Sequence, residues 1–132
     1  MRYIVDTHVL VRWLADPRRL SKEQFRILND LIRVQEPVGV SAITLVELAS
    51  LAQDNSQVGK FNFEKILDVV ESGEAFTVLP ISTKIARDAA RLLPVLRDPA
   101  DTLIAATALA HGLRLLTSDA RIVDTNCVAT IP

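Results

Sequence analysis

The chain has 132 residues, which suits one domain with a substantial core. Hydrophobic residues make up 49% of the sequence, charged residues make up 23%, and the formal net charge is −1. This composition excludes a disordered chain, and the absence of an apolar run of about 18 residues excludes a membrane span. A single cysteine, Cys127, excludes an internal disulfide and reads as a structural thiol. Met1 runs directly into a strand pattern without a leader, so we expect a cytosolic single domain over residues 1–132.

The periodicity of apolar residues predicts strands that alternate with helices in the first half of the chain. We expect a strand at 2–5, a helix at 7–15, a helix opened by a capping box at Ser21 with apolar positions Phe25, Leu28, Leu31 and Ile32, a strand at 38–40, a helix from Ser41 or Ala42, a polar loop at 54–60 and a helix at 63–71.

The second half continues the alternation. We expect a strand at 75–79, a helix from Ser82 or Thr83 that Pro94 ends after Leu93, a helix from Pro99 to His111 that Gly112 terminates, and strands at 113–117 and 127–131. Strands that alternate with helices indicate a largely parallel sheet covered on both faces. In such sheets ligands collect outside the carboxyl ends of the strands.

Four carboxylates stand where an apolar strand ends or within the start of a helix: Asp6, Glu47, Asp101 and Asp119. Hard divalent cations such as Mg²⁺ and Mn²⁺ prefer oxygen ligands of this kind. A bound cation of this type activates water and offsets charge on a phosphodiester. Each acid also has a structural alternative, because Asp6, Asp101 and Asp119 suit a helix start or a turn and Glu47 can reach solvent from its helix.

The order and contexts of these acids resemble the PIN domain, a metal-dependent ribonuclease fold, and most of all the small VapC-like toxins. The resemblance spans nearly the whole chain. It implies a three-layer α/β/α fold with a mainly parallel, about five-stranded central sheet. It also implies that Mg²⁺ or Mn²⁺ is bound by the catalytic set Asp6, Glu47, Asp101 and Asp119.

Further positions support this set. The hydroxyls of Thr7, Thr117 and Ser118 are placed to orient waters, and Asp98 is placed to cap the helix that carries Asp101. Asp124 is a weaker substitute for Asp119. His8 and His111 read as structural rather than catalytic. Many relatives with the Asp-Pro-x-Asp pattern place arginine where this chain has Thr102, so no local arginine contact is expected there.

The resemblance implies an endoribonuclease that acts as the toxin of a toxin–antitoxin pair, with RNA as substrate, a cognate antitoxin that blocks the acidic site, and a homodimer. The alternative is a noncatalytic RNA- or protein-binding module with the same fold, and DNA cleavage also stays open. Aspartyl-phosphate chemistry is disfavoured, because the residue two positions after Asp6 is His8 rather than a second acid.

Two surface features remain open to a functional or a structural interpretation. Apolar residues on the first two helices form either part of an antitoxin groove or part of the core: Trp13, Leu14, Leu20, Phe25 and Leu28. Basic residues in the same stretch contact phosphates or form a solvated helix face: Arg12, Arg18, Arg19, Lys22 and Arg26.

Overall fold

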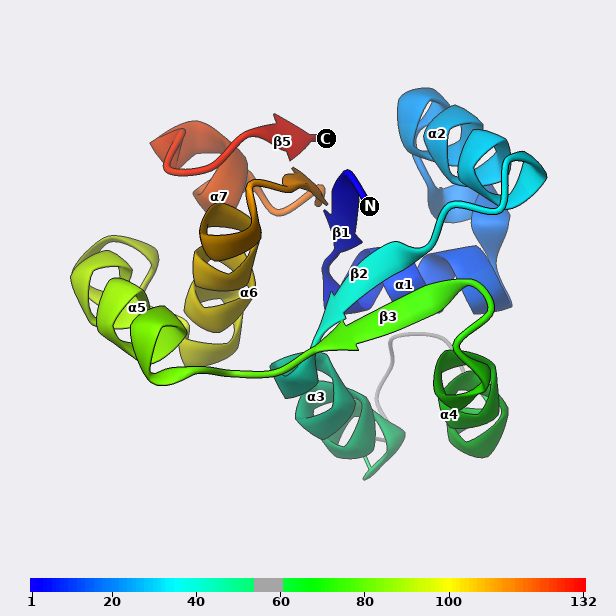
Figure 1. Ribbon diagram of the computed structural model, residues 1–132, viewed down its shortest axis with the longest axis horizontal. Helices are drawn as coiled ribbons and strands as arrows, with labels where there is room; N and C mark the ends of the chain where they lie inside the picture. The colour runs from blue at the N-terminus through cyan, green and yellow to red at the C-terminus, as the bar shows by residue number, and fades with distance from the viewer. Residues whose placement is uncertain (54–60) are drawn as a thin grey trace.

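The structure is a computed structural model that describes residues 1–53 and 61–132, so the loop predicted at 54–60 lies outside the described residues. Its elements are β1 (Tyr3–Val5), α1 (Thr7–Ala15), a 3₁₀ turn (Pro17–Arg19), α2 (Lys22–Arg33), β2 (Val38–Ser41), α3 (Ala42–Gln53), α4 (Phe63–Ser72), β3 (Phe76–Leu79), α5 (Thr83–Leu96), α6 (Pro99–His111), β4 (Arg114–Leu116), α7 (Ala120–Thr125) and β5 (Thr130–Ile131). Figure 1 shows their arrangement. None of the described helices is long and apolar enough to cross a membrane.

The five strands form one parallel sheet in the order β3-β2-β1-β4-β5. The chain begins at the central strand β1, moves outward through β2 to β3, and then crosses to β4 and β5 on the other side. The carboxyl ends of β1 and β4 therefore lie next to each other where the winding direction reverses. Ligand sites of open α/β sheets form at this kind of point.

Neighbouring residues of the central strands enter two separate hydrophobic cores on the two faces of the sheet. Val5 and Leu116 pack with α1, α2 and α4, whereas Ile4 and Leu115 pack with α5, α6 and α7. Figure 1 shows these helix groups on opposite sides of the sheet. This arrangement confirms the predicted three-layer fold, and it follows from the alternation of side chains along a strand.

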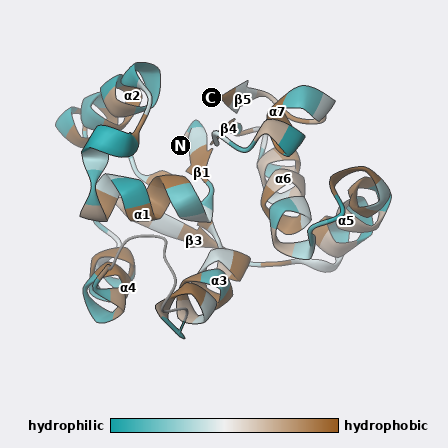
Figure 2. Cartoon of the chain, turned by 180° about the vertical axis from the view of Figure 1, so that it is seen from behind, coloured by the Kyte–Doolittle hydropathy of each residue, from teal (hydrophilic) through white to brown (hydrophobic). Residues whose placement is uncertain are grey.

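Helix α3 stands at the carboxyl end of the sheet because it starts directly after β2. Its residues are mostly hydrophobic, as Figure 2 shows, and it packs against α1, α4 and α6. Its buried Leu48 enters the core with α1, α2 and α4, and Ile43 packs against the other core. The neighbouring residue Glu47 is thereby held at the edge where β1 and β4 end.

The end predicted for the fifth helix is wrong. Helix α5 continues to Leu96, and Pro94 lies inside its last turn. Proline removes the hydrogen bond to the carbonyl of Ala90, but Ala90 and Pro94 are both exposed, so water can satisfy that carbonyl. Arg97 then ends the helix in the left-handed conformation, with φ 66°.

The C-terminal strands are shorter than predicted, and helix α7 was not predicted from the sequence. The pattern read as one strand from 127 to 131 pairs with β4 only at Thr130 and Ile131. Helix α7 has six residues and starts at a cap formed by Asp119. So short a helix carries less than two turns of periodicity, which explains why pattern reading missed it.

Candidate active site

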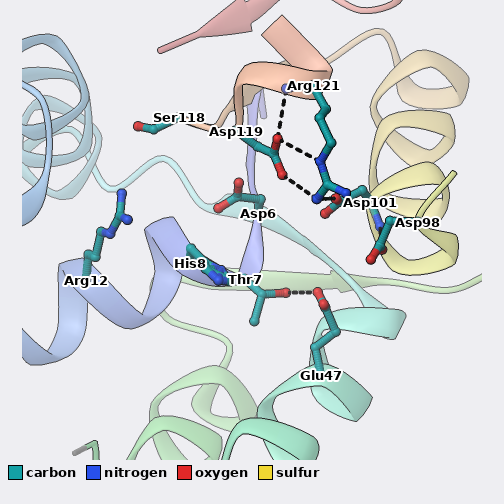
Figure 3. A pocket seen from close by; sticks show the side chains of 10 residues that line it. All are labelled: Asp6, Thr7, His8, Arg12, Glu47, Asp98, Asp101, Ser118, Asp119 and Arg121. Atoms are coloured by element: carbon teal, nitrogen blue, oxygen red, sulfur yellow. Dashed lines mark hydrogen bonds and ion pairs between the residues drawn. The ribbon is translucent and has the colours of Figure 1, made fainter. Parts of the chain in front are cut away.

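All four acids predicted from the sequence line one pocket of about 250 Å³ at the carboxyl edge of the sheet. Figure 3 shows its lining residues, which are Asp6, Thr7, His8, Arg12, Glu47, Asp98, Asp101, Ser118, Asp119 and Arg121. Three of the predicted supporting residues are in this list, and the fourth, Thr117, is buried and bonded to Asp6. Asp124 is exposed on α7 and does not line this pocket, so the structure does not bring it to the acids.

Asp6 is the most buried acid of the pocket, with 6% of its surface exposed. Its Oδ1 accepts a hydrogen bond from the backbone N–H of Val9 at 2.7 Å, so Asp6 does form the helix cap that was its structural alternative. Its Oδ2 accepts a hydrogen bond from the hydroxyl of Thr117 at 2.5 Å. Burial raises the pKa of this carboxyl, and the two hydrogen bonds act against the rise.

Glu47 reaches the pocket from α3 and is half-buried. The hydroxyl of Thr7 donates a hydrogen bond to its Oε1 at 2.5 Å, and the hydroxyls of Thr7 and Thr44 lie 3.1 Å apart. Burial raises the pKa of the Glu47 carboxyl, and the negative charge of Asp98 adds to the rise. The threonines predicted to orient waters therefore hold two of the acids directly.

Asp101 and Asp98 share the start of α6. Asp98 caps this helix, as predicted, because its Oδ1 accepts a hydrogen bond from the backbone N–H of Asp101 at 2.9 Å. The pKa of Asp101 is raised to about 7, first by burial and then by the carboxylates of Asp98, Asp119 and Glu47. Thr102 is buried and donates its hydroxyl to the backbone oxygen of Asp98 at 2.6 Å, so it brings no charge to the pocket.

Arg121 supplies a positive charge that sequence reasoning missed. Its Nη2 lies 3.0 Å from Asp101 Oδ2 and 3.0 Å from Asp119 Oδ2, and its Nε lies 3.3 Å from Asp119 Oδ1. Its backbone N–H also donates to Asp119 Oδ1 at 2.9 Å. Hydrogen bonding to Arg121 lowers the pKa of Asp119. The only local signal in the sequence was that Arg121 stands two residues after Asp119. This spacing indicates a contact only if a helix starts between them, and helix α7 was not predicted.

The basic residues early in the chain lie in two different environments in the structure. Arg18 pairs with Asp16 at 3.1 Å and Arg26 lies 3.6 Å from Asp30, so both belong to solvated surfaces. Arg12 is half-buried and lines the acidic pocket. Within residues 1–53 and 61–132, Arg12 forms no ion pair. Figure 3 shows it across the acids from Arg121.

The donor set suits a hard divalent cation, because four carboxylates face one solvent-accessible pocket. The raised pKa of Asp101 shows that the clustered carboxylates favour added positive charge, and the guanidinium of Arg121 already supplies part of it between Asp101 and Asp119. The side chains are not gathered around one point, however. Among the described residues, no three His, Cys, Asp or Glu side chains are placed to hold a metal ion together. Binding an ion therefore requires these side chains to move.

The profile of the PIN domain matches residues 3–126. Ribonuclease VapC22 of Mycobacterium tuberculosis is 33% identical over 120 residues, which cover 90% of this chain and 88% of that protein.

Solved structures resemble the fold over its whole length. A chain in the crystal structure of VapBC2 from Rickettsia felis, bound to a DNA fragment from its promoter, has a TM-score of 0.72 and 18% identity, with 99% of this chain and 98% of that chain covered. A chain of FitAcB from Neisseria gonorrhoeae has a TM-score of 0.68 and 24% identity, with 98% and 96% covered. At these identities the likeness concerns the fold.

Proposed function

Because the chain belongs to the PIN domain family, we propose that it is an endoribonuclease that hydrolyses RNA phosphodiester bonds and acts as the toxin of a toxin–antitoxin pair. The observation that carries this proposal is the convergence of Asp6, Glu47, Asp101 and Asp119 on one pocket. The similarity to a ribonuclease along most of both chains supports RNA as the substrate.

The proposed cofactor is Mg²⁺ or Mn²⁺, held by Asp6, Glu47 and Asp101, with Asp119 as a direct or water-mediated ligand. When bound, such an ion lowers the pKa of water and offsets the charge that develops on the phosphodiester. Both oxygens of Asp6 already accept hydrogen bonds, but a carboxylate oxygen has a second lone pair for a cation.

The protein's own residues prepare this site in two ways. Thr117 and Thr7 donate hydrogen bonds to the carboxylates of Asp6 and Glu47 and so keep both groups in the pocket, from which they move to a bound ion. Arg12 and Arg121 flank the acids and are suited to the phosphates of a polyanionic substrate, despite the net charge of −1.

Cleavage of single-stranded RNA tests the proposed activity. The wild-type chain is expected to cleave such RNA with Mg²⁺ or Mn²⁺ and to stop in excess chelator. Asp6→Asn should reduce the rate at least about a hundredfold, because it removes charge from the ion site. Asp124→Asn is the matched control and should leave the rate unchanged, since Asp124 is exposed outside the pocket. RNA that is bound but never cut would instead identify a noncatalytic binding module.

Thermal unfolding tests the metal site without relying on activity. Excess Mn²⁺ should raise the unfolding midpoint of the wild type, because an ion that binds only the folded state stabilises it. Asp6→Asn should unfold at an equal or higher temperature without metal and should gain much less from Mn²⁺. Equal metal-induced shifts in the two proteins would place the ion elsewhere.

The proposed antitoxin has an apolar pocket available at the end of α1, the helix whose earlier residues Thr7, His8 and Arg12 line the acidic pocket. A pocket of about 270 Å³ lies between α1 and α4 and is lined by Leu14, Ala15, Phe61, Asn62, Lys65, Ile66 and Val69. Leu14 and Phe25 are 37% and 47% exposed, whereas Leu20 and Leu28 are buried in the core. Of the five apolar residues named from the sequence, Leu14 and Phe25 are therefore accessible, Trp13 is half-buried, and the core interpretation holds for Leu20 and Leu28.

Inhibition by the product of a neighbouring reading frame tests the proposed partner. The partner should abolish cleavage by placing a cationic side chain near the acids and an apolar segment against the pocket between α1 and α4. Leu14→Asp should weaken the complex, whereas Leu109→Asp, at an exposed position on α6, should not. A complex that retains full nuclease activity would exclude this mode of inhibition. Homodimerisation stays a prediction from the resemblance.

A further inference from the structure

Arg121 stands at an unfavourable place for helix stability. It is the second residue of α7, where the helix dipole disfavours a positive side chain. Its guanidinium folds back over the cap residue Asp119 and also reaches Asp101 on α6, twenty residues away in the chain. The contact therefore joins the two elements α6 and α7 at the acidic pocket, and helix formation does not explain it.

The position of this guanidinium conflicts with a divalent ion. Asp101 and Asp119 both direct a carboxylate oxygen at the same Nη2 atom, at 3.0 Å each (Figure 3). Glu47 is held away from them by Thr7, and Asp6 is held by Thr117. An ion ligated by Asp101 and Asp119 needs the carboxylate oxygens that now face Arg121, so the two cations exclude each other.

We propose that Arg121 competes with the divalent cation for Asp101 and Asp119, and that metal binding transfers its guanidinium to a phosphate oxygen of the RNA. The inference rests on the proposed ribonuclease function. It assigns Arg121 two successive partners: the carboxylates in the metal-free protein and the substrate once the ion is bound.

The surroundings of Arg121 allow this exchange. Its side chain is 60% exposed, so it can turn toward the mouth of the pocket at little desolvation cost. Its backbone N–H still bonds to Asp119 at 2.9 Å, which keeps the base of the side chain at the rim. A divalent cation carries twice the charge and attracts the carboxylates more strongly. The planar guanidinium is also well suited to a phosphate.

The first experiment measures metal affinity. Metal-free wild type, Arg121→Gln and Arg91→Gln are titrated with Mn²⁺ by calorimetry, without RNA. Arg121→Gln should bind Mn²⁺ about three- to tenfold more tightly, the gain expected from removing two partly exposed ion pairs. Arg91→Gln is the matched control, because Arg91 pairs with Asp88 on α5 at 3.5 Å, outside the pocket. Unchanged or weaker Mn²⁺ binding by Arg121→Gln would overturn the competition.

The second experiment measures cleavage of a short RNA at saturating Mn²⁺. Arg121→Gln should lower kcat/KM by about tenfold, because a charge-assisted bond to phosphate is lost. Arg121→Lys retains the charge and should recover part of this loss. Tighter metal binding combined with slower cleavage is the expected pair of results, since a merely structural role would weaken both. An unchanged kcat/KM would overturn the phosphate contact.

The two experiments separate this inference from the proposed function. If wild type cleaves RNA but Arg121→Gln gains no affinity for Mn²⁺, the competition is wrong and the ribonuclease assignment stands. If no variant cleaves RNA although Arg121→Gln binds Mn²⁺ more tightly, the ribonuclease assignment and the phosphate contact both fail.

Discussion

Asp6 and Asp119 occupy equivalent places in the sheet but different electrostatic environments. Each follows one of the two adjacent strands β1 and β4, each caps the next helix, and both are connected to Thr117. Asp6 is buried and bonded only to neutral groups, so its pKa is raised. Asp119 is paired with Arg121, so its pKa is lowered. The same topological position thus yields one acid that needs a cation and another that already has one.

Replacing the acids one at a time is expected to give the largest measurable difference between Asp6 and Asp119. Asp6→Asn, Glu47→Gln and Asp101→Asn should each reduce metal-dependent RNA cleavage at least about a hundredfold, and Asp119→Asn only about tenfold. The smaller loss is expected because Asp119 is proposed as a direct or water-mediated ligand, whereas Asp6, Glu47 and Asp101 are proposed to hold the ion directly. Initial rates at a fixed Mn²⁺ concentration provide the measurement, and equal losses for Asp6→Asn and Asp119→Asn would contradict the distinction.

Asp98 is the internal reference for this series. It caps α6 and lines the pocket, so Asp98→Asn keeps a side-chain oxygen for the cap and should be milder than Asp101→Asn. If Asp98→Asn proves as damaging, the ligand role belongs to Asp98 and the two assignments must be exchanged.

The pH dependence of stability should distinguish the acids whose pKa is raised from Asp119, whose pKa is lowered. Because the folded state raises the pKa of Asp101 to about 7 from an ordinary value of 3.8, it binds more protons than the unfolded state between these values. The metal-free protein should therefore lose unfolding free energy through Asp101 as pH rises from about 4 to about 7. The loss should be about 2 kcal/mol, roughly half of what the full shift gives, because water screens this half-buried carboxyl.

Urea denaturation across this pH range is the measurement. Asp101→Asn should flatten the decline, leaving the smaller contributions of Asp6 and Glu47, whose pKa values are also raised. Asp119 has a lowered pKa, so its contribution is present above its unfolded pKa and is lost in acid. An unchanged slope in Asp101→Asn would show that this carboxyl is charged throughout the range.

Thr117 connects the two acids and tests whether their positions are coupled. Its hydroxyl donates to Asp6 Oδ2 and accepts a hydrogen bond from the backbone N–H of Asp119 at 3.1 Å. Thr117→Val should destabilise the protein by about 1–2 kcal/mol, because both groups lose a partner. Thr107→Val is the control, since the equally buried Thr107 bonds only to Leu103 within α6. Similar losses of unfolding free energy in both variants would mean that replacing any buried threonine has this cost, and that the link between Asp6 and Asp119 contributes nothing further.

Arg12 is expected to have the smallest effect, on the opposite wall from Arg121. Arg12→Gln should weaken RNA binding in chelator about threefold and lower the salt dependence of log K by about 0.7, the value for one phosphate contact on a single strand. Arg18→Gln removes an exposed arginine paired with Asp16 and should change neither quantity. Identical salt slopes for wild type and Arg12→Gln would exclude a phosphate contact at Arg12.

Local sequence rules determined the framework of this protein. The capping box at Ser21 and the caps at Asp6 and Asp98 were readable because their hydrogen-bond partners lie within four residues. The strand β1 was readable from its short apolar run. The convergence of the four acids also followed from the sequence, since the carboxyl ends of parallel strands share one edge. The resemblance to PIN domains named the same acids.

Only the tertiary structure decided how these acids are held. Thr117 bonds to Asp6 across 111 residues, Thr7 to Glu47 across 40, and Arg121 to Asp101 across 20. It also decided that Leu28 is buried while Phe25 on the same helix is 47% exposed. Such contacts depend on where the sheet places distant elements, and neither periodicity nor capping carries that information. The charge balance of the site therefore could not be predicted from the sequence, because it depends on α7 placing Arg121 against the acids.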